Sequence, residues 1–181
     1  MFHRLVLSLL LLLLLTSCDS PQQKKKLPTL MDAAEQGDLE VMDDFLVGKQ
    51  LVNMRNACLW TPLMLAALNG HYEAVEKLLN KGAEVDMVDK GGYSAMMLAA
   101  SNNFPFIVEL LIEKGADVNR VENTNGWTAL IWSAKQGHEA VVQVLLNHQA
   151  DKTVRDLTDT TAMEYAQLKK YESVIELLEQ E

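Results

Sequence analysis

The sequence matches itself when it is shifted by 33 residues, and this repeat constrains the fold more than any other feature. Residues 61–71 align with residues 94–104 at that spacing, with residues 128–138 after a further 34, and with the segment from Thr161 after 33 more. Upstream, residues 30–37 fit the same frame. A unit of this length cannot bury its apolar face alone, so we expect the units to stack on one continuous core.

Each unit carries start and stop signals for two helices. A threonine or serine can accept a hydrogen bond from the first turn of the first helix, at Thr61, Ser94, Thr128 and Thr161. Residues that tolerate left-handed backbone mark helix ends: Gly37, Gly70, Asn103 and Gly137 after the first helix, and Gly82 and Gly115 after the second. Lys49 and Gln149 replace that second glycine elsewhere, at an expected cost of roughly 1 kcal/mol. The pattern predicts an all-α repeat solenoid.

The motif T-P-L-x-x-A-A stands at residues 61–67 and recurs in looser form at residues 94–100 and 128–134, while G-H, V-x-x-L-L and G-A-x-V-D/N recur at the same period. With them the chain resembles the ankyrin repeat family over residues 28–181. The resemblance implies helix–turn–helix units with short β-hairpin loops projecting at right angles. We expect three full repeats, starting at Thr61, Ser94 and Thr128, between an opening unit and a closing helix pair that act as caps.

Two departures from the family pattern stand out. The histidine expected after T-P-L is replaced by Met64, Met97, Ile131 and Glu164. We therefore expect the family's histidine–threonine hydrogen bond to be absent, with an apolar contact in its place in three repeats. An extra residue near residues 123–125 should lengthen one hairpin, because a surface loop absorbs an insertion at small entropic cost.

Residues 1–17 have the pattern of a bacterial signal peptide. The apolar run of residues 5–15 would span about 16 Å as a helix, against about 30 Å for a hydrocarbon core, so it is too short for a stable anchor. Leu15-Thr16-Ser17-Cys18 resembles the lipoprotein lipobox, which implies cleavage before Cys18 and lipid on its sulfur. Asp19 resembles the signal that retains lipoproteins at the inner membrane. Residues 18–27 would then tether the domain on the periplasmic side.

Two alternatives to this localisation stay open. The leader is also compatible with a plain secretory signal followed by a chance cysteine, and translation from Met31 would give a minor cytoplasmic form. Lipidation of Cys18 would leave Cys58 without an intramolecular partner, since the chain has two cysteines. We then expect Cys58 to be a buried packing residue rather than a redox switch.

Composition and motifs argue against nucleic-acid binding and catalysis. The net charge of −9 disfavours a nucleic-acid partner, which needs a basic face. The sequence has no nucleophile elbow, metalloprotease helix or phosphate-binding loop, so we expect no enzyme, cofactor, metal or small-molecule substrate. His71 and His138 occupy the G-H position, where a structural role at the inter-helix turn is expected. Four aspartates in hairpins are predicted to close turns rather than bind calcium: Asp86, Asp89, Asp117 and Asp156.

Candidate partner-binding residues occupy the positions that vary between repeats. One row, just before the capping residue, holds Trp60, Tyr93, Trp127 and Thr160. A second row, on the first helix, holds Leu65, Leu98, Trp132 and Tyr165, of which the last two are larger than packing needs. Other candidates are Leu68, Asn69, Ser101, Asn102, Lys135, Gln136, Arg55 and Arg155. Exposed aromatics are typical of interface hot spots, although each ring could instead fold onto its own hairpin or serve inter-repeat packing.

These features predict a membrane-anchored protein that binds a partner protein. A lipobox with a short ankyrin array is similar to lipoproteins that act as immunity proteins against antibacterial toxins, some encoded beside phospholipase effectors of contact-dependent secretion systems such as type VI. That resemblance implies a lipase or phospholipase toxin as the partner. The alternative is a periplasmic partner of a housekeeping or stress-defence enzyme such as catalase.

Overall fold

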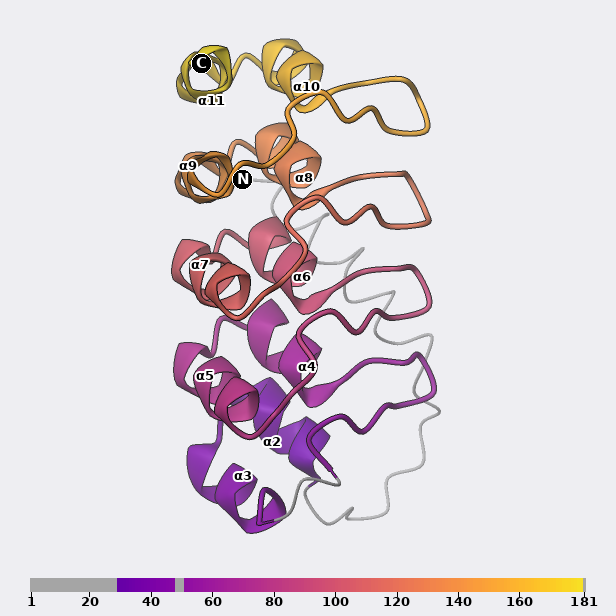
Figure 1. Ribbon diagram of the computed structural model, residues 1–181, viewed down its shortest axis with the longest axis vertical. Coiled ribbons are helices and arrows are strands. Elements are labelled where there is room, and N and C mark those ends of the chain that lie inside the picture. Colours follow the sequence, from indigo (N-terminus) through magenta and orange to yellow (C-terminus); the bar gives the residue numbers. More distant parts are fainter. Residues whose placement is uncertain (1–28, 48–50, 181) are drawn as a thin grey trace, which may run out of the picture.

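A computed structural model describes residues 29–47 and 51–180, and in these ranges the chain forms ten helices and no strand. The helices follow one another in five antiparallel pairs that stack into an elongated solenoid (Figure 1). The predicted all-α repeat architecture is confirmed. The predicted signal peptide (1–17), the tether (18–27) with Cys18 and Asp19, and Lys49 lie outside the described residues.

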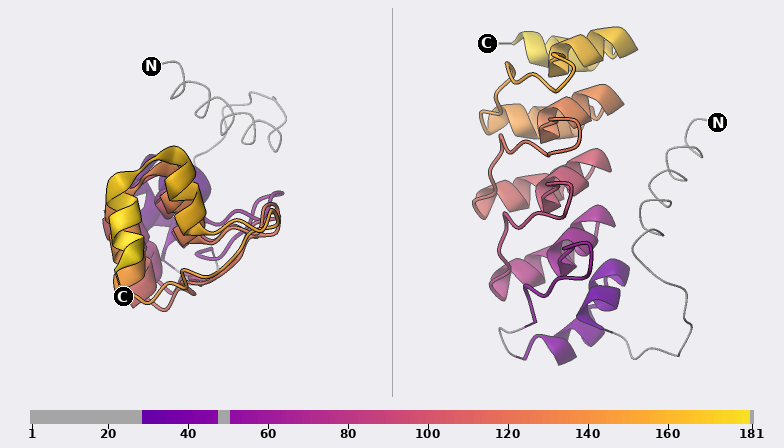
Figure 2. Two further views of the ribbon diagram at one scale, coloured as in Figure 1. Left: turned by 90° about the horizontal axis from the view of Figure 1, so that it is seen from above. Right: turned by 90° about the vertical axis from the view of Figure 1, so that its right-hand side faces the viewer.

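The two helices of each pair form two parallel columns. The first helices are α2 (Leu30–Gln36), α4 (Pro62–Leu68), α6 (Ala95–Ser101), α8 (Ala129–Gln136) and α10 (Ala162–Lys169). The second helices are α3 (Leu39–Phe45), α5 (Tyr72–Asn80), α7 (Pro105–Glu113), α9 (Glu139–Asn147) and α11 (Glu172–Glu179). Seen from above, the loops that join the pairs project together from the side of the first helices (Figure 2).

Side-chain caps begin the first helices, as predicted. The hydroxyl oxygens of Thr61, Ser94, Thr128 and Thr161 each accept from the backbone N–H three residues on. The missing histidine is replaced in two ways. The Met64 sulfur accepts from the Thr61 N–H at 3.4 Å, whereas the Glu164 carboxylate accepts from the Thr161 N–H at 2.7 Å. Glu164 therefore supplies a polar bond that a purely apolar replacement would lack.

Left-handed residues end the helices where the sequence predicts them. Gly70 and Gly137 have φ of 78° and 75°, and Asn103 and Gln149 both adopt 61°. At Gly70 a second constraint operates, because a Cβ there would lie 2.6 Å from the Phe104 ring of the next unit. Glycine at this position is therefore required by the backbone angle and by the space that Phe104 occupies.

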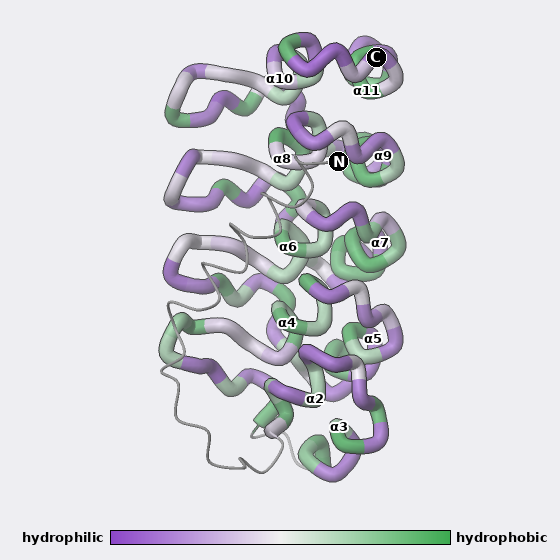
Figure 3. Tube along the Cα trace, turned by 180° about the vertical axis from the view of Figure 1, so that it is seen from behind, coloured by the Kyte–Doolittle hydropathy of each residue, from purple (hydrophilic) through white to green (hydrophobic). Residues whose placement is uncertain are grey.

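The core runs along the whole stack between the two columns of helices. Paired alanines on the first helices have no exposed surface, which lets neighbouring helices approach closely: Ala66, Ala67, Ala99 and Ala100. Valines and leucines of the second helices complete it, including Val75, Leu78, Val108 and Leu111. Figure 3 shows the hydrophobic residues on the helices and mostly hydrophilic residues at the helix turns. Each unit thus buries apolar surface both between its own two helices and against its neighbours.

The projecting loops are hairpins with little regular strand. Within the described ranges an isolated antiparallel bridge joins Val88 to Ser94. Each hairpin nevertheless closes with a backbone bond across its base, from the N–H of Asn56, Asp89, Glu122 or Asp156 to the carbonyl of Trp60, Tyr93, Trp127 or Thr160. Successive tips are also joined, since Asn123 donates to the Gly91 carbonyl at 2.8 Å and Leu157 to the Asn125 carbonyl at 2.9 Å.

Cys58 differs from the prediction. It is buried, as expected, but it is disulfide-bonded, so the expectation of a thiol without an intramolecular partner is wrong. The residue lies in the first described hairpin, where its N–H donates to the Asn56 side chain at 2.9 Å. Among the described residues, no helix is long and apolar enough to cross a membrane.

Candidate functional site

One acidic or amide side chain closes each of the four hairpins. An Asp89 oxygen accepts from the N–H groups of Gly91 and Tyr93, at 2.8 and 2.9 Å. Asn56 and Asp156 make the same pair of bonds in the first and last hairpins. The turn-closing role predicted for Asp89 and Asp156 is therefore confirmed. Asp86 and Asp117 also accept backbone N–H groups, those of Asp117 and Asn119.

Glu122 closes the third hairpin, a role that the sequence motifs did not predict. Its carboxylate accepts from the N–H groups of Thr124, Asn125 and Trp127, and Glu122 as a whole is 1% exposed. The longer side chain spans the inserted residue, since Trp127 lies five positions on rather than four. Burial opposes ionisation of Glu122, but these donors outweigh it and hold the pKa of the carboxyl below its usual value. The unequal repeat spacing was the available signal.

The aromatic residues of the hairpins bond to the acid of the next hairpin. The Trp127 indole N–H donates to Asp156 at 2.8 Å. Trp60 interacts with Asp89, where its side chain helps to lower the pKa of the carboxyl, and Glu122 interacts with Tyr93, where it helps to raise the pKa of the phenol. The predicted row thus folds onto the neighbouring hairpin rather than onto its own. Each ring keeps part of its surface exposed.

Asp156 gathers more donors than the other hairpin acids. Besides the Trp127 indole and two backbone N–H groups, it accepts from the Tyr165 hydroxyl at 2.6 Å and the Thr158 hydroxyl at 2.7 Å. Burial disfavours its charge, but the bonds from Tyr165, Thr158, Thr160 and Trp127 outweigh that effect and lower its pKa. At Asp89 the balance is reversed, and burial raises the pKa despite the donors around it.

Four rings from both predicted rows form a continuous ladder along the stack. Trp132 contacts Tyr93 edge-on at a centroid distance of 5.4 Å and Trp127 at 5.2 Å, and Trp127 contacts Tyr165 at 6.3 Å. We call Tyr93, Trp132, Trp127 and Tyr165 the aromatic ladder. It crosses three consecutive units at the place where first helices meet hairpins. Edge-to-face contacts of this kind fix ring orientation.

Lys135 lies over the ladder. Its ammonium nitrogen is 3.9 Å from the centroid of Trp127 and 4.5 Å from that of Tyr165. Burial lowers the pKa of Lys135, while the nearby Asp156 charge works in the opposite direction. The structure therefore brings the four ladder rings and Lys135, all predicted as partner-binding residues, into a single cluster with the buried Asp156 carboxylate.

The remaining candidates lie beside the ladder or away from it. Leu68 is buried, whereas Asn69, Ser101 and Asn102 use their side chains to bond carbonyls at the ends of their own helices. Gln136 is half-buried beside Lys135.

Arg55 and Arg155 are at opposite ends of the hairpin row. Arg55 bonds the carbonyls of Leu59 and Val88, and Arg155 bonds the Asp159 carbonyl at 2.6 Å and Glu164 at 3.4 Å. Both guanidinium groups remain exposed, so their predicted role in binding would involve exchange of these internal bonds.

The histidines of the G-H motif link neighbouring units. A ring nitrogen of His71 lies 2.9 Å from the Glu35 carbonyl, and one of His138 lies 3.0 Å from the Ala100 carbonyl. Burial lowers the pKa of His138, with the Ala100 bond opposing it. These contacts confirm a structural role. In residues 29–47 and 51–180, no group of three or more histidine, cysteine or acidic side chains could hold a metal ion.

Comparison with known proteins assigns the family. A family model described as "Ankyrin repeats (3 copies)" matches residues 30–122 and 118–181. The chain belongs to the ankyrin repeat family. Ankyrin repeats imply a role in protein–protein interaction, and the fold is typically non-enzymatic.

The matched relatives share only a short stretch with this ankyrin chain. The NAD-capped RNA hydrolases NUDT12 of Homo sapiens, Macaca fascicularis and Pongo abelii are each 37% identical over 54 residues, which is 30% of this chain and 12% of the relative. The likeness is confined to their ankyrin region and does not indicate catalysis here.

Proposed function

We propose that the partner of this ankyrin array binds across the aromatic ladder and Lys135. The observation that carries the proposal is Trp132. At the equivalent positions the first two full repeats hold Leu65 and Leu98, both buried, so the stack can be built with leucine. The half-buried indole at Trp132 therefore adds apolar surface that the fold does not require.

The ladder has the physical properties of an interface hot spot. Its rings are partly exposed, and three of them are fixed by hydrogen bonds or by edge-to-face contacts on both sides. Ordering such side chains on binding costs little entropy, because they are already held in one orientation. Lys135 adds a cation that a partner carboxylate could approach, and the polar side chain of Gln136 follows it at the end of α8.

The repeats supply the variant that tests this surface. Trp132→Leu installs the residue of the equivalent positions, so we expect a change in unfolding free energy below about 1 kcal/mol. Affinity for the partner should fall at least about tenfold, because a central aromatic anchor is lost. Lys135→Ser, which copies Ser101, is the matching variant for the charge. Unchanged affinity in both variants would place the interface elsewhere.

At a finer level, we propose that the partner is a lipase or phospholipase toxin and that the protein is its immunity protein. The support is the resemblance of residues 15–18 to a lipobox together with a short ankyrin array. A tethered inhibitor is concentrated at the membrane that such a toxin attacks. If the partner is such a toxin, deletion of the gene should sensitise the cell to it. Peroxide sensitivity without toxin sensitivity would favour the stress-defence alternative, a partner such as catalase.

The tether is a separate part of the proposal with its own chemistry. Lipidation requires a thioether on the Cys18 sulfur, so that sulfur can take part in no disulfide. The mass of the intact protein under non-reducing conditions distinguishes a lipidated Cys18 from a disulfide-bonded one. Diacylglycerol and acyl groups add mass, whereas a disulfide removes two hydrogens. Unlipidated protein would end the lipoprotein proposal and leave the protein-binding proposal standing.

Internal translation from Met31 is a third part of the proposal. Such a form would lack Thr29, whose side chain caps α2, and Leu30, which is buried. We therefore propose that any cytoplasmic form has a weakened first unit. A C-terminally tagged protein should show a second band that survives mutation of Met1.

A further inference from the structure

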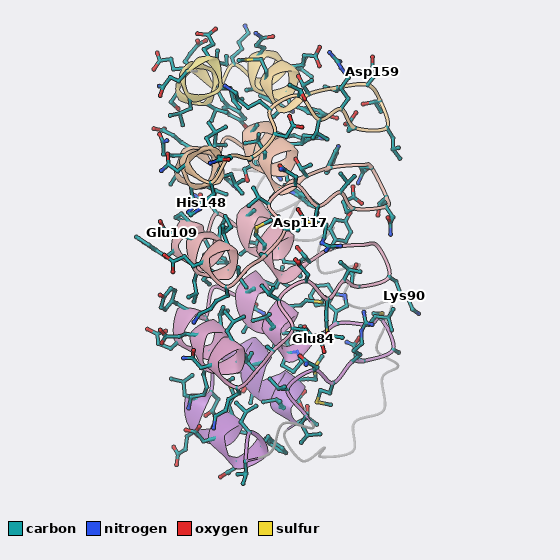
Figure 4. The ribbon with its side chains drawn as sticks, viewed as in Figure 1. Glu84, Lys90, Glu109, Asp117, His148 and Asp159 are labelled. Carbon is teal, nitrogen blue, oxygen red and sulfur yellow. The ribbon has the colours of Figure 1, made fainter. Side chains whose placement is uncertain are left out.

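A groove lies where α5 and α7 meet the turns that precede them. Its volume is about 560 Å³, and Tyr72 of α5 and Phe104, Phe106 and Leu110 at α7 contribute its apolar walls. Figure 4 shows Glu109 at the outer edge of α7, away from the hairpins, where Lys90 marks one of the tips. The groove therefore belongs to the column of second helices and shares no residue with the ladder.

The other repeats show that the stack does not need this apolar surface. Phe106 is 75% exposed, and the equivalent positions hold Glu73, Ala140 and Ser173. Three helix pairs of the same array thus form with a charged, small or polar residue at this place. A large ring kept in water is unfavourable by itself and is typical of an interaction surface.

The charge around the groove is acidic and one-sided. Glu109 and Glu113 line it, and no lysine or arginine does. The positions equivalent to Glu113 hold the neutral amides Asn80, Asn147 and Gln180, so this carboxylate is particular to the unit that carries Phe106. Neither side chain of the pair has an ion-pair partner among the described residues.

We propose that this groove binds a basic, amphipathic segment of a partner protein. An apolar side chain of that segment would lie against Phe106 and Tyr72, and its lysines or arginines would face Glu109 and Glu113. A second copy of this chain is a poorer occupant, because a symmetric contact through the groove brings the same carboxylates together. An anionic lipid surface is disfavoured for the same reason. This surface is independent of the one proposed above.

A model peptide tests the proposal on the whole mature chain. The probe is an 18-residue amphipathic helix of leucine and lysine, titrated into isotopically labelled protein and followed by NMR. The matched peptide has glutamate in place of every lysine. We expect shifts at Tyr72 and along α7 with the basic peptide only, and weaker binding as salt is raised. Equal binding of the acidic peptide, or shifts confined to the ladder, overturns the proposal.

Two variants and one control make the test specific. Phe106→Ala copies Ala140 and should weaken binding at least about tenfold, and Glu109→Gln with Glu113→Gln should abolish its salt dependence. The control is Leu168→Ala, because Leu168 is 74% exposed on α10 and should leave binding unchanged. Circular dichroism confirms that each variant is folded. Phe106-dependent binding to phosphatidylglycerol vesicles but not to the peptide, or Phe106-dependent dimerisation in sedimentation, would contradict a basic protein segment as the occupant.

Discussion

At the scale of single residues, the hairpin acids decide how the candidate surface is held. Asp89, Glu122 and Asp156 each accept the N–H groups of their own turn, and each also interacts with an aromatic side chain of the preceding hairpin. The ladder therefore rests on anions that are largely buried. Interface and stability are coupled here, because the group that orients the rings also closes the turn.

Replacing Asp156 with asparagine should distinguish the roles of the two carboxylate oxygens. One oxygen can still close the turn, but the amide nitrogen would face the Trp127 indole and the Tyr165 hydroxyl, both of which are donors. We expect a loss of about 2 kcal/mol in unfolding free energy and a changed tryptophan fluorescence. Asp159→Asn is the control in the same hairpin, since its side chain is exposed; an equal loss there would refute the argument.

The pH dependence of stability should report the Glu122 carboxylate. Its pKa is lowered from an ordinary value of 4.5, so the folded chain binds this proton less readily than the unfolded chain. The stabilisation is complete above 4.5 and is lost as the pH falls through the folded value. The gap in unfolding free energy between wild type and Glu122→Gln should therefore shrink in acid. A constant gap down to pH 3 would contradict this assignment.

At the scale of elements, helix ends fix how one unit meets the next. A ring from each following unit lies against a left-handed glycine: His71 on Gly37, Phe104 on Gly70 and Tyr171 on Gly137. The second helices end at Gly82 and Gly115, where nothing lies within 4 Å of an added Cβ. The same residue type thus serves close packing at one helix end and backbone freedom alone at the other.

Two glycine substitutions distinguish these roles. Gly82→Ala, at φ 91°, should cost about 1 kcal/mol through backbone strain alone. Gly70→Ala should cost about 2–4 kcal/mol, because the strain is joined by overlap with the Phe104 ring. Thermal unfolding of both variants measures the difference, and equal costs would show that the ring moves aside freely.

The elements were predictable because each is specified locally. Caps such as Thr128 and stops such as Gly137 act within one turn of helix, and their recurrence makes each assignment support the others. Glu122 was not predictable from the same motifs, since an inserted residue had to be matched by a longer side chain. The groove at Phe106 was not predictable for another reason. A phenylalanine in an apolar helix is expected in the core, and only the structure shows that Phe106 lies on the exposed side of α7.

The ladder was only half predictable. The repeat placed Trp60, Tyr93 and Trp127 in one row and Trp132 and Tyr165 in another. Their contacts across units depend on ring orientation, which local sequence does not specify. The bonds to the next hairpin emerge only when the units are stacked, and so does the place of Lys135 over two rings.

At the scale of the whole molecule, the array presents two separate surfaces on a rigid stack. The ladder lies where first helices meet hairpins, and the Phe106 groove lies on the column of second helices. Because the two surfaces share no residue, we expect changes at one surface to have little effect at the other. This separation lets binding to the two faces be tested with independent variants.

The most direct test of the central claim, that the partner binds across the ladder, is site-specific photo-crosslinking in the native cell. A photoreactive residue at position 136 lies next to Lys135, and one at position 143 lies on the exposed side of α9. We expect one crosslinked partner from position 136 that is lost in the Trp132→Leu background, and from position 143 only a product that depends on Phe106. Failure to capture a partner from position 136, or a product there that is insensitive to Trp132→Leu, would contradict the claim.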